Sequence, residues 1–206
     1  MNDAVLEFLR SAIDPADVTG KSVLEVGSLD FNGSARTVLA EWNPARYLGV
    51  DMQKGPGVDR VLSVSYLIDT FGEKAFDVVV STEMLEHVQD WRWAVSQLKR
   101  STAAGGLLVV TTRSPGFYYH GYPHDFWRFT EADFRHIFSD MQDVAVVSDT
   151  FAPGVFVAAR RPIVFTELDL QGFDVATSPD PPPGSLWKHV KHSVRNRLRS
   201  LTRRWR

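Results

Sequence analysis

The sequence predicts an α/β fold with a doubly wound, mostly parallel β-sheet, and three observations lead to this prediction. Short apolar runs recur along the chain and alternate with segments of helical spacing, which is the pattern of repeated strand–helix units. Residues 23–26 form such a run, which leads into a turn holding Gly27 and Gly33, and helical spacing follows over residues 34–42. Residues 76–80 are apolar on both faces, as in the central strand of a parallel sheet. In such sheets a ligand binds at the carboxyl ends of the strands.

The same periodicities place the elements up to residue 112. The expected strands are 23–26, 47–51, 58–64, 76–80 and 107–112, and the short one at 58–64 is expected near the sheet edge. Apolar residues spaced by three and four predict helices over residues 3–13, 34–42 and 91–98. Because glycine terminates helices readily, Gly105 and Gly106 are expected to stop the last of these.

The segment after residue 130 predicts one more helix and a strand pair. Thr130 and Asp133 have the spacing of a capping box, and an apolar stripe follows them. Residues 144–147 and 156–159 are expected to pair at the sheet edge, and Arg161 with Pro162 ends the domain. The expected organisation is a domain over residues 1–162, a Pro-rich linker over 163–184, and a basic amphipathic helix or tail over 185–206.

Charge is distributed unevenly between the body and the tail. Residues 185–206 hold eight basic residues and no acidic one, whereas residues 1–184 hold 15 basic and 25 acidic residues, so the body carries −10. An acidic body argues against nucleic-acid binding, which depends on neutralising phosphates. The tail is expected to anchor at a membrane surface, to dock on the acidic body of its own or a second subunit, or to be disordered. Docking is favoured, and it predicts a homo-oligomer.

Composition excludes some chemistry but does not fix the compartment. The 206 residues include no cysteine, which excludes disulfides and thiolate metal sites. No signal peptide is recognisable, and no apolar run approaches the ~20 residues needed to span a bilayer. The expectation is a cytoplasmic protein, peripheral at the membrane if the tail anchors there.

The glycine turn after the first strand indicates which ligand binds. A dinucleotide fingerprint would need a glycine at Leu29, and a P-loop would need Lys followed by Ser or Thr after Gly33. The turn instead carries Glu25 and Asp30, which repel phosphate and suit an ammonium group. Asp51, at the end of the second strand, is placed to hold two ribose hydroxyls. A ribose and an ammonium without phosphate indicate S-adenosylmethionine.

Four segments then carry a family resemblance. Residues 23–27 with Gly33, 47–51, 76–88 and 105–111 resemble, in this order and spacing, the class I S-adenosylmethionine-dependent methyltransferases, over residues 20–160. The resemblance implies a Rossmann-like sheet of seven strands with an antiparallel strand near one edge. It departs from the family at Leu29, where a loop glycine is common, and at Ser63, where many members carry an Asp for the adenine amine.

Cofactor-binding residues are expected from the turn, the strand ends and the resemblance. They are Glu25, Gly27, Ser28, Asp30, Gly33, Asp51, Met52, Ser63, Glu83 and His87. The thioether of Met52 either lies on the adenine face or packs in the core. The resemblance implies that Glu86 and His87 shape the pocket floor near the donor; the alternative is a helix-starting turn with solvated acids.

The segment from Arg113 to Thr130 holds seven aromatic residues among hydroxyl, His and Arg side chains. Long loops of this kind are usually lids or binding loops. Rings beside hydrogen-bonding groups suit a sugar, and Tyr118, Tyr119, Tyr122 and Arg128 are the expected substrate-binding residues. The end of the segment resembles carbohydrate and natural-product methyltransferases, the nearest type being the actinobacterial sugar O-methyltransferases that act on mannosides. A natural-product acceptor, or a cofactor-binding module that no longer catalyses, is the alternative.

A hydroxyl acceptor needs a base to take its proton. His120 and His124 are the candidates because histidine titrates near neutrality. Asp125 is expected to orient one of them or to act as base itself, and Glu83 is the reserve. His120, His124 and Asp125 could instead hold a divalent cation together with substrate hydroxyls, since imidazole and carboxylate are ordinary ligands.

Overall fold

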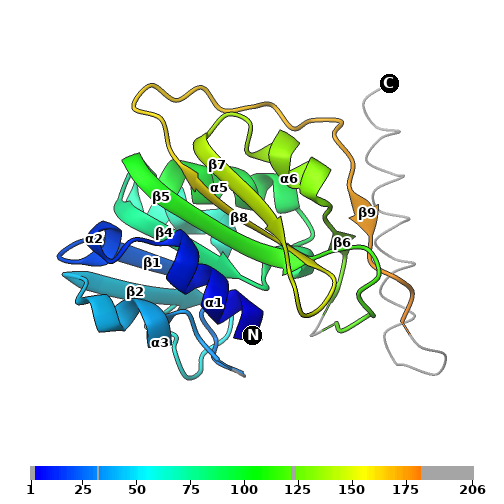
Figure 1. The fold of residues 1–206 in the computed structure, drawn as a ribbon, viewed down its shortest axis with the longest axis horizontal. Helices are drawn as coiled ribbons and strands as arrows, with labels where there is room; N and C mark the ends of the chain where they lie inside the picture. Colours follow the sequence, from blue (N-terminus) through cyan, green and yellow to red (C-terminus); the bar gives the residue numbers. More distant parts are fainter. Residues whose placement is uncertain (1–2, 32, 122–123, 182–206) are drawn as a thin grey trace.

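A seven-stranded sheet in the order β3-β2-β1-β4-β5-β8-β7 lies at the centre of the molecule (Figure 1). The computed structural model describes residues 3–181 except residues 32 and 122–123. The strands are β1 (Ser22–Val26), β2 (Arg46–Asp51), β3 (Arg60–Val61), β4 (Phe76–Thr82), β5 (Thr102–Arg113), β7 (Gln142–Ser148) and β8 (Gly154–Arg160). All neighbours from β3 to β5 pair in parallel, and β8 runs antiparallel to both β5 and β7. This confirms the predicted fold class, with the antiparallel strand one place from the edge.

Alternating side chains of the central strands feed two apolar cores, one on each face of the sheet. Val23 of β1 and Val78 of β4 are paired in register and face the first core. Their neighbours Leu24 and Val79 are also paired, and they face the second core on the opposite side. Burial of both faces is the reason that these strands read as continuous apolar runs in the sequence.

Helices cover both faces of this sheet (Figure 1). The first core packs against α1 (Asp3–Ala12), α2 (Pro15–Val18), α3 (Arg36–Leu39) and the 3-10 turn η1 (Ala40–Trp42). The second packs against η2 (Val64–Tyr66), α4 (Leu67–Phe71), η3 (Leu85–His87), α5 (Trp91–Ser101) and α6 (Glu131–Ile137). Helix α6 starts at the predicted capping box, in which Thr130 Oγ1 accepts from the Asp133 amide at 3.1 Å and the Asp133 carboxylate accepts from the Thr130 amide at 2.7 Å.

The prediction that Gly105 and Gly106 stop a helix is wrong. Helix α5 ends at Ser101, where Thr102 already has extended backbone angles. Both glycines lie inside β5, in a bulge between Thr102, which pairs with Phe76, and Leu107, which pairs with Val78. Gly105 has a φ of +74° there, a conformation that glycine adopts without steric cost.

The expected domain boundary at residue 162 also needs correction. Leu170 is buried in the second core, and the Arg92 side chain donates to its carbonyl at 3.0 Å. Strand β9 (Ala176–Thr177) pairs with β6 (Trp127–Arg128), and Ser178 Oγ donates to the Asp125 carbonyl at 2.5 Å. The chain as far as Ser178 is therefore part of the domain and is not a spacer. The predicted tail over 185–206 lies outside the described residues.

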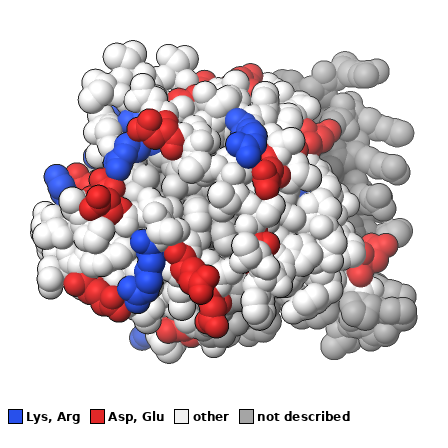
Figure 2. All heavy atoms as spheres, in the orientation of Figure 1, with Lys and Arg blue, Asp and Glu red and all other residues white. Residues whose placement is uncertain are grey.

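Charged side chains of opposite sign neighbour one another on the face of the molecule in Figure 2. The described residues of this face show no continuous basic area, unlike the concentrated Lys and Arg surface of a nucleic-acid-binding protein. Within the described ranges, no helix combines the length and apolar character needed to cross a membrane.

Candidate active site

A cleft of about 590 Å³ opens at the carboxyl ends of β1, β2, β4 and β5. One half, which we call the donor half, is formed by the turn after β1 and the end of β2. Of the predicted cofactor residues it presents Glu25, Gly27, Ser28, Gly33, Asp51 and Met52. The other half, the acceptor half, is formed by the turn after β4 and the loop after β5. It presents Glu83, His87, Tyr118, His120 and His124.

Gly27 occupies a position that other residues cannot fill without a clash. Its φ is +80°, and a Cβ atom there would lie 2.7 Å from Cγ of Met84. Met84 itself lines the cleft, so the missing side chain lets the turn after β1 approach the turn after β4. The sequence predicted Gly27 as a turn residue of the cofactor site, and its close approach to Met84 is seen only in the structure.

Glu25 is buried and organises the turn from beneath. Its carboxylate accepts hydrogen bonds from the Ala35 amide at 3.0 Å and from the Tyr47 hydroxyl at 2.8 Å, and also from Ser34. Burial raises the pKa of Glu25, and these hydrogen bonds oppose the shift. Asp30 likewise serves the turn, since it accepts from the Gly33 amide at 2.8 Å and does not line the cleft. Contact of either carboxylate with an ammonium group stays a prediction.

Asp51 ends β2 with its carboxylate at the cleft. One oxygen accepts from the Leu29 amide at 3.3 Å and the other from the Gln53 amide at 2.8 Å. Each oxygen retains acceptor capacity, so two ribose hydroxyls can be held there. Met52 is 66% exposed and lines the cleft, which excludes the core-packing alternative. Ser63 does not line the cleft; its hydroxyl caps η2 by accepting from the Ser65 amide.

Glu83 enters the acceptor half in a left-handed backbone conformation, with a φ of +54°. Such strain costs of order 1–3 kcal/mol and is concentrated at functional sites. Its carboxylate accepts from the Thr111 hydroxyl at 3.1 Å and forms an ion pair with Arg113. Burial and the negative charge of Glu86 raise the pKa of Glu83 to about 7, and Arg113 opposes this shift.

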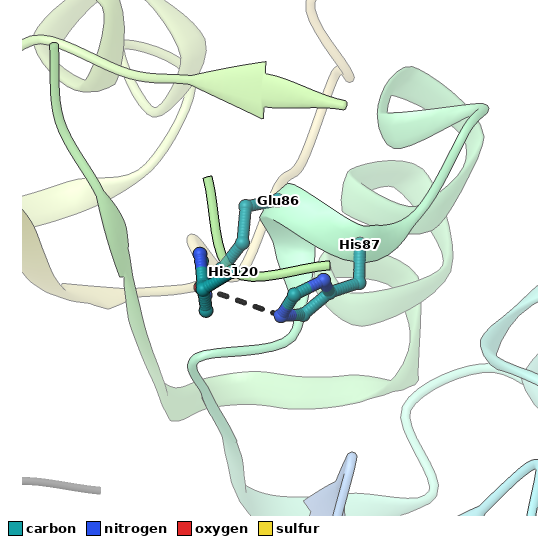
Figure 3. A group of neighbouring side chains, drawn as sticks. All are labelled: Glu86, His87 and His120. Atoms are coloured by element: carbon teal, nitrogen blue, oxygen red, sulfur yellow. Dashed lines mark ion pairs between the residues drawn. The ribbon is translucent and has the colours of Figure 1, made fainter. Parts of the chain in front are cut away.

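Three titratable side chains converge in the acceptor half (Figure 3). Glu86 and His87 come from η3, and His120 comes from the loop after β5. Nε2 of His120 lies 3.6 Å from Oε1 of Glu86, and Nε2 of His87 lies 3.9 Å from the same oxygen. We call these three residues the Glu86 cluster. Burial acts to raise the pKa of Glu86, but the nearby imidazoles of His120 and His87 hold it below its ordinary value.

Behind this cluster, Asp125 and Arg128 form a buried ion pair. The Arg128 guanidinium donates to both carboxylate oxygens at 2.5 and 2.7 Å, and Asp125 also accepts from Nδ1 of His120 at 3.0 Å. Burial acts to raise the pKa of Asp125, but Arg128 and His120 hold it well below its usual range. Burial acts to lower the pKa of His120, but its hydrogen bond to Asp125 and the Glu86 carboxylate raise that pKa to about 9.

Several predicted site residues therefore do not reach the cleft. Arg128 is buried and donates to the carbonyls of Tyr118 and Trp127 at 3.0 and 2.7 Å, so it organises the loop and does not bind substrate directly. Asp125 and Tyr119 are also absent from the described lining. Tyr122 lies outside the described residues. The ring of Phe117, which sequence reasoning left out of the site, lines the cleft and stacks on Tyr118 with centroids 4.5 Å apart.

The predicted metal set of His120, His124 and Asp125 is not assembled. Asp125 contacts Nδ1 of His120, the ring nitrogen that faces away from Glu86. Among the described residues, the group whose polar atoms lie close enough to share a metal ion is the Glu86 cluster. The sequence analysis expected Glu86 to shape the pocket floor near the donor and did not include it among the predicted metal ligands. Ligands of such sheets bind beyond the carboxyl ends of the strands, so an acid that follows a central strand is a candidate functional residue.

Comparison with known protein families finds a match over most of the chain. The sequence profile of a family described as a methyltransferase domain matches residues 1–143. No curated protein matches the chain.

Solved structures of methyltransferases share the fold at low sequence identity. One is the 1,6-didemethyltoxoflavin N1-methyltransferase of Burkholderia thailandensis, with bound S-adenosylhomocysteine (16% identity, 78% of this chain and 79% of that one, TM-score 0.59). Another is the N-methyltransferase NodS of Bradyrhizobium japonicum (17% identity, 78% and 98%, TM-score 0.58). A third is the magnesium protoporphyrin IX methyltransferase of Synechocystis, with bound S-adenosylmethionine (19% identity, 77% and 77%, TM-score 0.53). At these identities the likeness shows the fold.

Proposed function

This chain belongs to the methyltransferase domain family and is an S-adenosylmethionine-dependent methyltransferase, and from that premise we propose that its acceptor is a hydroxyl group of a saccharide or glycoside. The observation that carries the proposal is the acceptor half of the cleft. It combines exposed aromatic rings with a buried cluster of carboxylate and imidazole groups. Rings suit the apolar C–H faces of a sugar, and the cluster suits an acceptor oxygen that must lose a proton.

The donor half fits the cofactor. Asp51 would hold the ribose hydroxyls, Gly27 leaves room for close approach, and the exposed thioether of Met52 would lie on the adenine. When bound, S-adenosylmethionine supplies a methyl group on a sulfonium, which passes to the acceptor oxygen as the C–S bond breaks and its electron pair stays on sulfur. Since the donor is already activated, the main task of the protein is alignment.

Phe117 and Tyr118 support the choice of a sugar. The Tyr118 side chain is 69% exposed, although Phe117 stacks on it and Arg113 lies over the Phe117 ring at 4.3 Å. A stacked pair with one exposed ring offers a rigid apolar wall to the cleft, which is the contact that sugar rings need. Mannosides are the first acceptors to examine, because the aromatic loop resembles enzymes of that type.

For the proton of the hydroxyl, we assign His124 as the general base. Of the predicted candidates, Asp125 is ion-paired behind the cluster, and both ring nitrogens of His120 are directed at carboxylates. Glu83 is held by Arg113 and Thr111. His124 lines the cleft outside the cluster, with its ring packed on Phe126 at 5.4 Å, and this position in the acceptor half, whatever else its ring contacts, carries the assignment.

A screen of acceptors with labelled donor tests the proposal. We expect methylation of a saccharide, with mannosides tested first. Methylation of a phenol or an amine and of no saccharide would defeat the sugar acceptor and favour the natural-product alternative. Saturable binding of S-adenosylhomocysteine by calorimetry, with turnover on no acceptor, would favour a module that binds cofactor without catalysing. A homo-oligomer, a cytoplasmic location and a tail at the membrane surface remain predictions.

A further inference from the structure

Three ligand atoms of the Glu86 cluster point at one another from two separate segments of the chain (Figure 3). They are Oε1 of Glu86 and one ring nitrogen each of His87 and His120, and all lie within 4.8 Å of one another. Bonds of about 2.0–2.2 Å from each atom to a common ion would place neighbouring ligand atoms about 3–3.5 Å apart. The 3.6 Å and 3.9 Å separations exceed this range by a few tenths of an ångström, and the third separation, between the two imidazole nitrogens, is within 4.8 Å, so the side chains would close around an ion.

The second polar atom of each of these side chains is already engaged. Nδ1 of His120 is bonded to Asp125 at 3.0 Å, and Nδ1 of His87 lies 2.5 Å from the His124 carbonyl. The Thr112 hydroxyl donates to Oε2 of Glu86 at 2.8 Å. These contacts direct both Nε2 atoms and Oε1 inward. A carboxylate or carbonyl behind each imidazole is the arrangement that metal-binding histidines use to fix their tautomer and orientation.

Oε1 of Glu86 gives independent support. Glu86 is fully buried, and Oε1 finds no hydrogen-bond partner among the described residues. A buried carboxylate oxygen without a donor is costly, and native structures usually satisfy such an atom with a protein donor, a water or an ion. The oxygen instead faces two imidazole nitrogens at 3.6 and 3.9 Å, distances that are longer than a hydrogen bond.

We propose that Glu86, His87 and His120 bind a divalent first-row transition metal ion. Two imidazoles and one carboxylate suit Mn²⁺, Fe²⁺, Co²⁺ or Zn²⁺, whereas Mg²⁺ and Ca²⁺ prefer oxygen ligands throughout. Three protein ligands leave further coordination positions open toward the cleft. This ligand set replaces the one predicted from sequence. Asp125 is not a ligand in the new set; it orients His120 by bonding to Nδ1.

The open positions also specify the acceptor, an inference that rests on the proposed function. Two adjacent hydroxyl oxygens of a sugar can occupy neighbouring positions on one ion, so we assign a vicinal diol as the substrate group. Coordination lowers the pKa of the bound hydroxyl. Its O–H bond then breaks toward His124, the oxygen forms the bond to the methyl carbon, and the C–S bond breaks with its electron pair on sulfur. The oxidation state of the ion does not change.

Direct metal binding is the test, because it does not require the acceptor. The full-length protein is freed of metal with a chelator and titrated with Mn²⁺, while the paramagnetic resonance signal of the free ion is followed. We expect one Mn²⁺ per chain, with binding weakened more than 100-fold in Glu86→Gln and in His120→Ala. Thr112→Val, which removes only the supporting hydroxyl, should weaken binding about 10–100-fold. His136→Ala, an exposed histidine on α6, is the matched control and should bind Mn²⁺ as the wild type does.

The far-ultraviolet circular dichroism and the cooperative thermal unfolding of each variant show that it has folded, independently of cofactor and metal. If Glu86→Gln does not fold, the partly exposed His87→Ala replaces it, with the same expected loss. No saturable Mn²⁺ binding to wild type, or equal binding to wild type and to the cluster variants, would overturn the proposal. The acceptor is judged separately. Methylation only of saccharides that lack adjacent hydroxyls would overturn the diol and leave the proposed function standing, whereas metal binding with methylation of no saccharide would sink the proposed function and leave the metal site standing.

Discussion

The two halves of the cleft are built differently, although they face each other across a few ångströms. The donor half is held by contacts within two neighbouring strand–turn units, where Glu25 bonds Ala35 and Asp51 bonds the Leu29 amide. The acceptor half draws together residues that are distant in the chain, since the His87 ring contacts the His124 carbonyl and the Ser178 hydroxyl donates to the Asp125 carbonyl. Because the donor half depends on local contacts, different proteins can share it. The acceptor half depends on long-range packing, so it can differ between proteins that share the same donor half.

This contrast predicts that changes in each half act on different measurements. The largest effect is expected in the acceptor half, at the proposed base. His124→Ala should lower turnover by about 10²–10⁴-fold, because the acceptor hydroxyl loses the group that takes its proton. Labelled-donor turnover at saturating cofactor measures this, with His136→Ala as the control. Wild-type turnover in His124→Ala would remove it from this role and leave Glu83 as the candidate.

The next largest effect concerns the fold of the acceptor half. Arg128→Met should destabilise the protein by about 3–5 kcal/mol, because the buried carboxylate of Asp125 loses the guanidinium that donates to both of its oxygens and keeps only His120. Denaturant unfolding measures the change. Arg135→Met removes an exposed ion pair with Glu131 on α6 and should cost less than about 1 kcal/mol. Equal stability of the two variants would contradict a supporting role for Arg128.

In the donor half we expect a smaller loss, confined to cofactor affinity. Asp51→Ala should weaken binding of S-adenosylhomocysteine by about 1–3 kcal/mol, since two ribose hydroxyls lose a charged acceptor. Calorimetry measures the affinity, and Asp69→Ala, an exposed acid on α4, is the control. An unchanged affinity would place the ribose elsewhere in the cleft.

In the acceptor half, the stability of the protein should also depend on pH through Glu83. Because burial raises the pKa of Glu83 to about 7, the folded protein binds a proton that the unfolded chain releases near its ordinary pKa of about 4.5. The Glu83 carboxyl group therefore does not lower the free energy of unfolding below pH 4.5, and it lowers that free energy progressively as the pH rises from 4.5 to about 7. In metal-free protein, the unfolding free energy of Glu83→Gln relative to wild type should rise over this window. A difference that is constant from pH 5 to 8 would argue against the raised pKa.

The smallest effect on the cleft is expected from the tail. Every described residue that lines the cleft precedes Asp125, so a chain ending at Gly184 should bind S-adenosylhomocysteine with wild-type affinity. If the basic tail docks on the acidic body of a second subunit, truncation should lower the sedimenting mass. Neither the full-length nor the truncated protein should then bind anionic vesicles. Vesicle binding that is lost on truncation and weakens with salt would favour the membrane anchor instead.

Much of the donor half was predictable from sequence because its determinants are local. A glycine at a strand end, an acid at the end of the next strand and apolar runs of strand length each carry their physical reason within a few residues. The same holds for the capping box at Thr130, where both partners lie three residues apart. The error at Gly105 and Gly106 arose because glycine serves both helix ends and strand bulges, and only the pairing with β4 distinguishes them.

The sequence by itself determined the parallel sheet, the family and the strand ends at which a cofactor fits, since periodicity and turn residues act over short distances. Only the tertiary structure decided what the aromatic loop does. Arg128 was expected to contact substrate, but it is buried and bound to Asp125 and two carbonyls. Glu86 was expected either on the pocket floor or as a solvated acid, and the structure buries it beside His87 and His120. The physical reason is that a charged side chain takes its role from its partners and its burial, and both are set by segments far apart in the chain.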